Sequence, residues 1–232
     1  MKSIVKNILV LTALVLPGQL VLAQDWANLK KYQEENAKLA PAAPNENRVV
    51  FMGNSITEGW KRSRPEFFSA NPYIGRGIGG QTTPQMLVRF HQDVVALNPK
   101  VVVMLCGIND IAGNTGPSTL EMIQDNIAAM TEIARANKIR VVLSSVLPAF
   151  SFPWRKEVNP VDKVIELNKW IKAYAEKHKL TYVDYFSAMK DERNGLPKSL
   201  AEDGIHPNAA GYAIMEPLVQ KAIAQAMKQK VK

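Results

Sequence analysis

The sequence has 232 residues, enough for one compact domain and short of what two domains of ordinary size need. Its composition of 47% hydrophobic and 22% charged residues is typical of a soluble globular protein, and excludes disordered, collagen-like and multi-span membrane proteins. A single cysteine, Cys106, excludes an internal disulfide and a thiolate metal cluster, and only three histidines are present. Any chemistry therefore depends on hydroxyl, carboxylate and amide groups and on very few imidazoles.

Residues 1–23 have the pattern of a secretory signal peptide: an early pair of lysines, an apolar run, and the small residue Ala23 at the expected cleavage point. A membrane anchor is the alternative, but Pro17, Gly18 and Gln19 interrupt the apolar run, which is shorter than the roughly 20 residues of a spanning helix. We expect cleavage near Ala23 and an exported protein, periplasmic or secreted, with no stable membrane span.

Removal of residues 1–23 lowers the net charge from +8 to +6, because this segment contains two lysines and no acidic residue. The remaining positive charge is spread thinly and forms no stripe of basic and aromatic residues, so we expect no nucleic-acid partner. The positive balance favours, weakly, an attraction to acidic polysaccharides.

The mature chain is predicted to begin with a helix and linker at 24–47, followed by a single domain over 48–232. Apolar and aromatic residues at helical spacing predict a helix over 25–40, which stops at Pro41. The segment 41–47 (PAAPNEN) has the composition of a linker.

Short aliphatic runs in the larger segment predict buried parallel strands, separated by amphipathic helices. The strands are predicted at Val49–Met52, Val101–Leu105, Val141–Leu147 and Thr181–Val183, with a weaker candidate at Tyr73–Ile74. This alternation indicates an α/β fold with a parallel sheet covered on both faces. Ligands of such sheets bind beyond the carboxyl ends of the strands, so functional residues are expected directly after strands.

Four segments in strand-following or loop positions contain residue types suited to nucleophilic catalysis. They are Gly53–Gly59 (GNSITEG), Gly77–Thr83 (GIGGQTT), Gly107–Asp110 (GIND) and Asp203–Asn208 (DGIHPN). Each segment alone has a simpler interpretation, as a helix cap, a glycine loop or a turn. Their combination in this order favours a shared site.

The chemistry of acyl transfer explains why these residue types belong together. A serine hydroxyl becomes a good nucleophile when an imidazole takes its proton, and a carboxylate fixes the tautomer of that imidazole. Ser55, His206 and Asp203 fit these positions, because Asp203 lies three residues before His206 in a tight loop. The oxyanion formed by attack needs fixed donors, for which the Ser55 N–H, the Gly80 N–H and the Asn109 side-chain amide are candidates.

The four segments resemble, in order, the four blocks of the SGNH hydrolases, also called GDSL esterases/lipases. The spelling GIGGQTT is most similar to the platelet-activating-factor acetylhydrolase-like branch, which includes bacterial carbohydrate acetylesterases, and the resemblance spans roughly residues 48–225. It implies a flavodoxin-like three-layer α/β/α sandwich with a roughly five-stranded parallel sheet, and chemistry without a metal or other cofactor. By position, it implies Ser55 as nucleophile, Asp203 and His206 as acid and base, and Ser55, Gly80 and Asn109 as oxyanion donors. Asn54 departs from the family pattern, which has Asp before the serine.

Substrate contacts are predicted from residues near the same edge of the sheet. The segment Phe150–Arg155 (FSFPWR) follows the fourth strand in chain order, where Trp154 can stack on a sugar ring and Arg155 can meet a carboxylate. Arg76, just before the second glycine segment, is a further candidate. The alternative for the aromatic loop is that it packs its rings inward.

These features predict an exported serine esterase that removes short acyl groups, with acetyl favoured, from carbohydrates. The expected partner is a small-molecule or glycan ester, and the sequence leaves the oligomeric state open. A lysophospholipase or thioesterase of the same family is the alternative enzyme. A glycan-binding module without catalytic activity is the alternative from another class of protein.

Overall fold

The computed structural model describes residues 25–230, so the predicted signal peptide at 1–23 lies outside the described residues. One five-stranded parallel sheet has the strand order β2-β1-β3-β4-β5. The strands are β1 (Val49–Gly53), β2 (Tyr73–Gly77), β3 (Val101–Leu105), β4 (Arg140–Ser144) and β5 (Thr181–Val183). This is the order of flavodoxin-like sheets, and the predicted fold class is confirmed.

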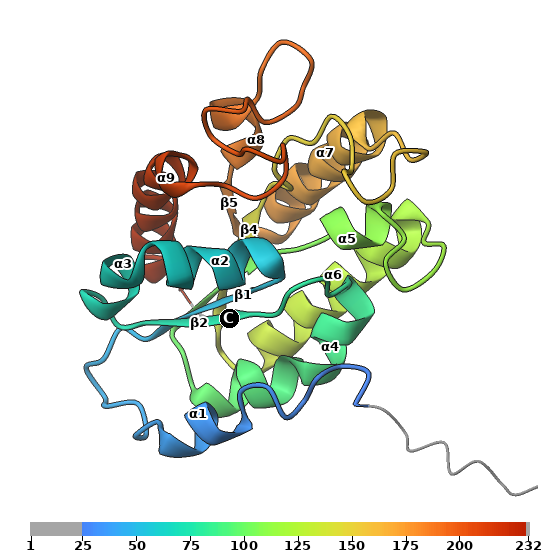
Figure 1. Cartoon of the computed structure of the whole chain (residues 1–232). Coiled ribbons are helices and arrows are strands. Elements are labelled where there is room, and N and C mark those ends of the chain that lie inside the picture. Colours follow the sequence, from blue (N-terminus) through green and yellow to red (C-terminus); the bar gives the residue numbers. More distant parts are fainter. Residues whose placement is uncertain (1–24, 231–232) are drawn as a thin grey trace, which may run out of the picture.

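Helices cover both faces of the sheet (Figure 1). On one face α2 packs on β1 and β2, and α9 packs on β3, β4 and β5; on the other face lie α4, α6 and α7. Their bounds are α1 (Gln33–Lys38), α2 (Ser55–Ser63), α3 (Pro65–Ser69), α4 (Thr83–Asp93), the 3₁₀ helix η1 (Val95–Leu97), α5 (Ile108–Ile111), α6 (Leu120–Ala136), α7 (Val161–His178), α8 (Tyr185–Met189) and α9 (Ala209–Met227). Because β1 and β3 are covered on both sides, all their residues are buried, which explains their unbroken apolar runs.

Two strands differ in extent from the sequence prediction. The β2 strand continues to Gly77, three residues beyond the predicted end, although its sequence contains two glycines and an arginine. The β4 strand begins at Arg140 and ends at Ser144, three residues before the predicted end. The reason is that both backbone groups of Val146 bond to the side-chain amide of Asn168 on α7, which replaces a neighbouring strand.

The N-terminal segment is also different from the predicted long helix. Only Gln33–Lys38 is helical, and residues 25–39, which we call the N-terminal strap, run along α4 and the end of β2. Three glutamine side chains donate to strap carbonyls at distances of 2.6 to 2.7 Å, and these carbonyls therefore accept from neighbours rather than from helical N–H groups. Within the strap, Ala27 and Tyr32 are buried, so this segment is part of the folded domain.

Among residues 25–230, the helices are either too short or too polar to cross a lipid bilayer. The single cysteine, Cys106, is buried directly after β3, as expected for a small core residue.

Candidate active site

The parallel sheet brings the four predicted segments to one edge. Ser55 follows β1, Gly80 follows β2 and Asn109 follows β3, so all three lie beyond carboxyl ends of strands. The loop that contains Asp203 and His206 comes after β5 and α8 and leads into α9. Residues separated by about 150 positions therefore meet at the same edge, as the sheet topology requires.

Ser55 is the first residue of α2 and is half-buried. Asn54 is the N-cap, and its side-chain oxygen accepts a 3.1 Å hydrogen bond from the N–H of Ile56. The Asn54 amide nitrogen is buried and has no hydrogen-bond partner among the described residues. An aspartate here would cap the helix equally well without an idle donor, so the departure from the family pattern preserves the turn and adds a small local cost.

A continuous hydrogen-bond chain joins the hydroxyl, the imidazole and the carboxylate. The distance from Ser55 Oγ to His206 Nε2 is 2.9 Å, and that from His206 Nδ1 to Asp203 Oδ2 is 2.6 Å. The other oxygen, Asp203 Oδ1, accepts the backbone N–H groups of Ile205 and His206. These bonds hold the loop closed, so that both nitrogens of the ring have a defined partner.

The pKa of Asp203 lies below its usual value. Partial burial raises this pKa, but hydrogen bonds from the His206 ring and from the His206 and Ile205 N–H groups more than offset that effect. The carboxylate therefore remains ionised at neutral pH, as a partner for the Nδ1–H group must be. Asp203 is 41% and His206 39% exposed at the side chain, so solvent reaches this pair.

The loop between β2 and α4 is anchored on several sides. Gly79 N–H donates to the Glu58 carboxylate at 2.9 Å, and the Gly80 carbonyl accepts from Asn114 at 3.2 Å. Gly80 has φ +75°, a conformation that favours glycine, and its N–H donates to no acceptor among residues 25–230. The loop is thus tied to its neighbours on two sides, and within the described residues one backbone donor at its tip has no partner.

Asn109 and Asp110 fix the same loop from the end of β3. The Asn109 amide donates to the carbonyl of Gln81 at 2.9 Å, which uses one of its two hydrogens. The buried Asp110 carboxylate accepts both the N–H and the hydroxyl of Thr83, the latter at 2.6 Å. Burial raises the pKa of Asp110 to about 6 in spite of these bonds. Asp110 faces Thr83 and is not the partner of His206.

In the aromatic loop, Phe150–Arg155, one ring is buried in the core and others are exposed. Phe152 is fully buried, whereas Trp154 is 46% exposed and its ring lies 6.3 Å from that of His206. Trp154 Nε1 donates to the side-chain oxygen of Asn114 at 3.2 Å. The guanidinium of Arg155 lies next to Gly113 and is partly exposed. Trp154 and Arg155 therefore lie at the same edge as Ser55.

The side chain of Arg76 does not open into the site, and the prediction that it binds substrate is wrong. Its side chain is 1% exposed, beneath the N-terminal strap. The guanidinium bonds to the Asn36 side-chain oxygen and to the Glu35 carboxylate, and it lies over the ring of Tyr32. With its donors used in this way, Arg76 holds the strap against β2.

Arg89 supports the site in a way that the sequence reading missed. It is fully buried on α4 and donates to the carbonyls of Gly53 and Arg76, near the ends of β1 and β2. It also donates to the Gln81 side chain at 2.6 Å and pairs with Asp93 at 3.1 Å. The available signal was its position on the apolar face of α4, where a charged residue needs buried partners.

Two hollows differ in size and place. One of about 280 Å³ is lined by Asp203, His206 and neighbouring residues of their loop. Another of about 470 Å³ lies at the opposite end of the sheet, near the first residue of β4. The Ser55–His206–Asp203 chain, rather than the larger volume, identifies the candidate active site, because there a nucleophilic hydroxyl and an imidazole base lie within hydrogen-bond distance.

The sequence profile described as the GDSL-like Lipase/Acylhydrolase family matches residues 51–214. The crystal structure of a GDSL-like lipase from Bacteroides thetaiotaomicron is 50% identical, with a TM-score of 0.85 over 86% of this chain and 98% of that one. A candidate acylhydrolase from Bacteroides fragilis is 47% identical, with a TM-score of 0.87 over 88% of this chain and 100% of that one. The acetylxylan esterase of Geobacillus stearothermophilus is 24% identical over 198 residues, 72% of this chain and 90% of its own length.

Proposed function

The chain belongs to the GDSL-like lipase/acylhydrolase family, and we propose that this hydrolytic enzyme is an exported serine esterase that removes acetyl groups from a carbohydrate. The observation that carries the catalytic assignment is the contact of Ser55 Oγ with His206 Nε2 at 2.9 Å, continued to Asp203 at 2.6 Å. A binding module without catalysis gives no reason for this chain of contacts, and family membership argues against it.

In the proposed reaction, His206 Nε2 takes the hydroxyl proton as Ser55 Oγ attacks the ester carbonyl. The imidazolium then gives this proton to the departing alcohol, which leaves an acetyl group on Ser55. Water, deprotonated by the same nitrogen, attacks the acetyl-serine, and acetate leaves as Ser55 regains its proton. Asp203 holds the Nδ1–H throughout and stabilises the transient positive charge of the ring.

The oxyanion is assigned to donors from the ends of three strands: the N–H groups of Ser55 and Gly80 and the amide of Asn109. Ser55 N–H points out of the first turn of α2, where helical N–H groups have no intrahelical partner. Among the described residues Gly80 N–H has no acceptor, and Asn109 has one hydrogen beyond its bond to Gln81. Each such donor is worth about 3–4 kcal/mol of transition-state stabilisation.

The substrate assignment rests on the character of the surrounding edge. The loop residues that line the hollow beside His206 are polar apart from Pro207, so this hollow offers no extended apolar groove for a long acyl chain. The exposed ring of Trp154 next to His206 offers a flat apolar surface of the kind on which sugar rings stack. The related acetylxylan esterase acts on an acetylated glycan, in agreement with both features.

The catalytic assignment is tested with Ser55→Ala. This variant is expected to fold normally, to lose hydrolysis of 4-nitrophenyl acetate, and to resist labelling by a serine-directed fluorophosphonate that labels the unchanged protein. Retention of full activity by the variant contradicts the role of Ser55. Acetate release from a panel of acetylated glycans then tests the substrate class, and a series of 4-nitrophenyl esters tests the acyl length. Activity that rises steadily towards long chains favours the lysophospholipase alternative.

Export is tested separately, because residues 1–23 carry that part of the proposal. Expression of the full chain in a Gram-negative host should give a mature protein in the periplasm or medium, with Gln24 as its first residue. An uncleaved protein in the membrane fraction contradicts the proposed cleavage.

A further inference from the structure

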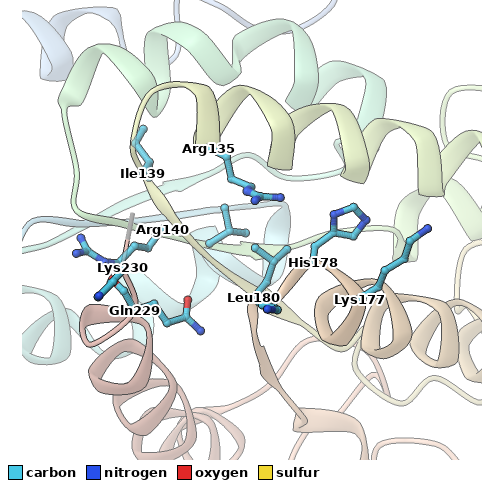
Figure 2. A pocket seen from close by; sticks show the side chains of 10 residues that line it. Arg135, Ile139, Arg140, Lys177, His178, Leu180, Gln229 and Lys230 are labelled. Carbon is cyan, nitrogen blue, oxygen red and sulfur yellow. Dashed lines mark hydrogen bonds between the residues drawn. The ribbon is translucent and has the colours of Figure 1, made fainter. Parts of the chain in front are cut away.

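The cavity of about 470 Å³ at the far end of the sheet is unusually basic (Figure 2). It lies between the C-terminal ends of α6 and α7, the start of β4 and the residues that follow α9. Five of its ten lining residues carry a permanent positive charge, and His178 is a sixth basic group: Arg135, Arg140, Lys177, Lys179 and Lys230 are the five. The lining residues, all within the described range, include no aspartate or glutamate.

The helix ends account for only part of this charge. Three helices end here, and each C-terminus is equivalent to roughly half a negative charge, which basic residues in a last turn offset. About one and a half negative charges therefore face five positive ones. Glu132 and Glu176 lie on α6 and α7 but outside the lining. Among residues 25–230, the five basic side chains form no ion pair with a carboxylate.

Two of the basic groups have defined contacts, and the cations are spread along the cavity. Arg140 Nε donates to the backbone oxygen of Gln229 at 2.9 Å, and the Gln229 amide donates to Thr181, which ties the end of the chain to the sheet. His178 packs on Tyr174, with ring centroids 4.2 Å apart. In Figure 2, Arg140 and Lys230 lie at one end of the cavity and Lys177 at the other.

The distribution of charge and apolar surface indicates the kind of ligand. Spaced cations suit a ligand with several separate anionic groups better than one compact anion, and guanidinium groups bind carboxylates in a bidentate way. Half-buried Leu180 adds an apolar surface between the cations, of the kind that the C–H faces of sugar rings cover, above the buried Ile139 and Val141. The volume lies within the range of ordinary ligand sites.

We propose that this cavity is a second binding site, for a polysaccharide segment that carries spaced uronate carboxylates. The choice of a glycan over other polyanions rests on the proposed carbohydrate function. The site is separated from Ser55 by the length of the sheet, since Arg140 begins β4 while the catalytic edge lies beyond its carboxyl end. Binding here tethers the enzyme to an acidic polysaccharide and leaves the active site free to act on acetylated sugars nearby.

The test is calorimetric titration of the full mature chain with oligogalacturonate, and with the same oligomer fully methyl-esterified as an uncharged control. The variant Arg135→Gln/Lys177→Gln/Lys230→Gln removes three cations of the cavity. The matched variant Lys163→Gln/Lys169→Gln/Lys221→Gln removes three exposed lysines elsewhere. We expect saturable binding of the charged oligomer only, weakened about tenfold by the first variant and little by the second.

Equal weakening by both variants, or none by the first, overturns the proposal, because binding then depends on overall charge or on another surface. Tighter binding of single-stranded DNA or of phosphatidylglycerol vesicles overturns the assignment to a glycan. Both variants should hydrolyse 4-nitrophenyl acetate at the unchanged rate. Failure of the binding site is therefore distinguishable from failure of the proposed esterase function, which Ser55→Ala tests alone.

Discussion

The hydroxyl of Tyr212 on α9 donates a 2.8 Å hydrogen bond to the carbonyl oxygen of Ile56, the residue that follows Ser55. Tyr212 comes six residues after His206, so this buried contact joins the helix that begins with the serine to the helix that follows the histidine. Its ring also stacks on Trp60, with centroids 5.5 Å apart. The pair fixes the relative position of two segments whose side chains must stay within hydrogen-bond distance.

Replacement of Tyr212 by Phe tests this connection. The ring and its stacking remain, but one buried hydrogen bond is lost, so the free energy of unfolding should fall by about 1 kcal/mol. Looser placement of Ser55 against His206 should lower kcat for 4-nitrophenyl acetate and leave KM nearly unchanged. Urea denaturation and steady-state kinetics measure the two effects. An unchanged kcat in a destabilised protein limits Tyr212 to a purely structural role.

Gly59 provides a second test of the same contact. A Cβ atom at this position would lie 2.7 Å from the Tyr212 hydroxyl oxygen and 3.9 Å from the ring carbon that carries it. Gly59→Ala should therefore destabilise the protein, although alanine is favoured over glycine within a helix by about 1 kcal/mol. In the Tyr212→Phe background the same change should be neutral or stabilising. Additive effects in this double-mutant cycle contradict the predicted clash.

Asp203→Asn should lower kcat and leave the fold intact. The asparagine oxygen can still accept the two backbone N–H groups, but its amide faces the Nδ1 position with a donor and favours the wrong tautomer of His206. We expect a loss of at least about a hundredfold, below the roughly 10⁴-fold loss at a buried triad, because water reaches the exposed Asp203. Single-turnover kinetics and thermal melting check the two parts. Near-normal turnover contradicts the assigned role.

Asp110 should make stability depend on pH in the opposite sense to most carboxylates. The pKa of Asp110 is about 6 in the folded protein, against an ordinary 3.8. The contribution of Asp110 to the stability of the folded protein is therefore most favourable below pH 3.8 and is lost as the pH rises through about 6. Relative to the unchanged protein, Asp110→Asn should therefore gain up to about 3 kcal/mol between pH 4 and pH 7. Urea denaturation across this range measures the difference. A difference that does not vary with pH contradicts the raised pKa.

Variants of Trp154 test the proposed glycan binding separately from catalysis. Trp154→Ala should raise KM for an acetylated glycan roughly tenfold, in line with the loss of an exposed aromatic contact, without changing turnover of 4-nitrophenyl acetate. Trp154→Phe keeps an aromatic surface but removes the bond to Asn114, and should restore most of the glycan affinity. An equal loss of glycan affinity in both variants contradicts ring stacking. It indicates instead that affinity depends on the hydrogen bond from Trp154 to Asn114, which in turn bonds to Gly80.

The sequence predicted the features that depend on local pattern. The strands at 101–105 and 181–183 were found with the predicted bounds, because buried parallel strands are short aliphatic runs. The proximity of Ser55, Asp203 and His206 followed from the topology and from the family resemblance, while their catalytic roles stay predictions.

What the sequence did not reveal depends on contacts between distant residues. Arg76 lies next to a glycine loop in sequence, but the N-terminal strap buries its side chain. The local sequence around Arg76 gives no sign of this burial. The strap itself has helical spacing, yet glutamines of α4 bind its carbonyls and prevent a continuous helix. The hydrogen bonds from Thr83 to the Asp110 carboxylate could not be predicted from sequence either. Each residue has a sufficient local explanation, as part of a turn or as a helix cap.

The N-terminal strap has a consequence for the order of folding. A ribosome makes the first residues of the domain earliest, but the partners of the strap are made later: Leu29 bonds to a residue 63 positions further along. The hydrogen bond from the Tyr32 hydroxyl to the Gly77 carbonyl, and that from the Gln81 amide to the Ala27 carbonyl, likewise form only after the later residue has been made. The first residues of the folded domain therefore gain these contacts only after α4 has been made, and we expect a fusion partner attached directly at Asp25 to interfere with that step.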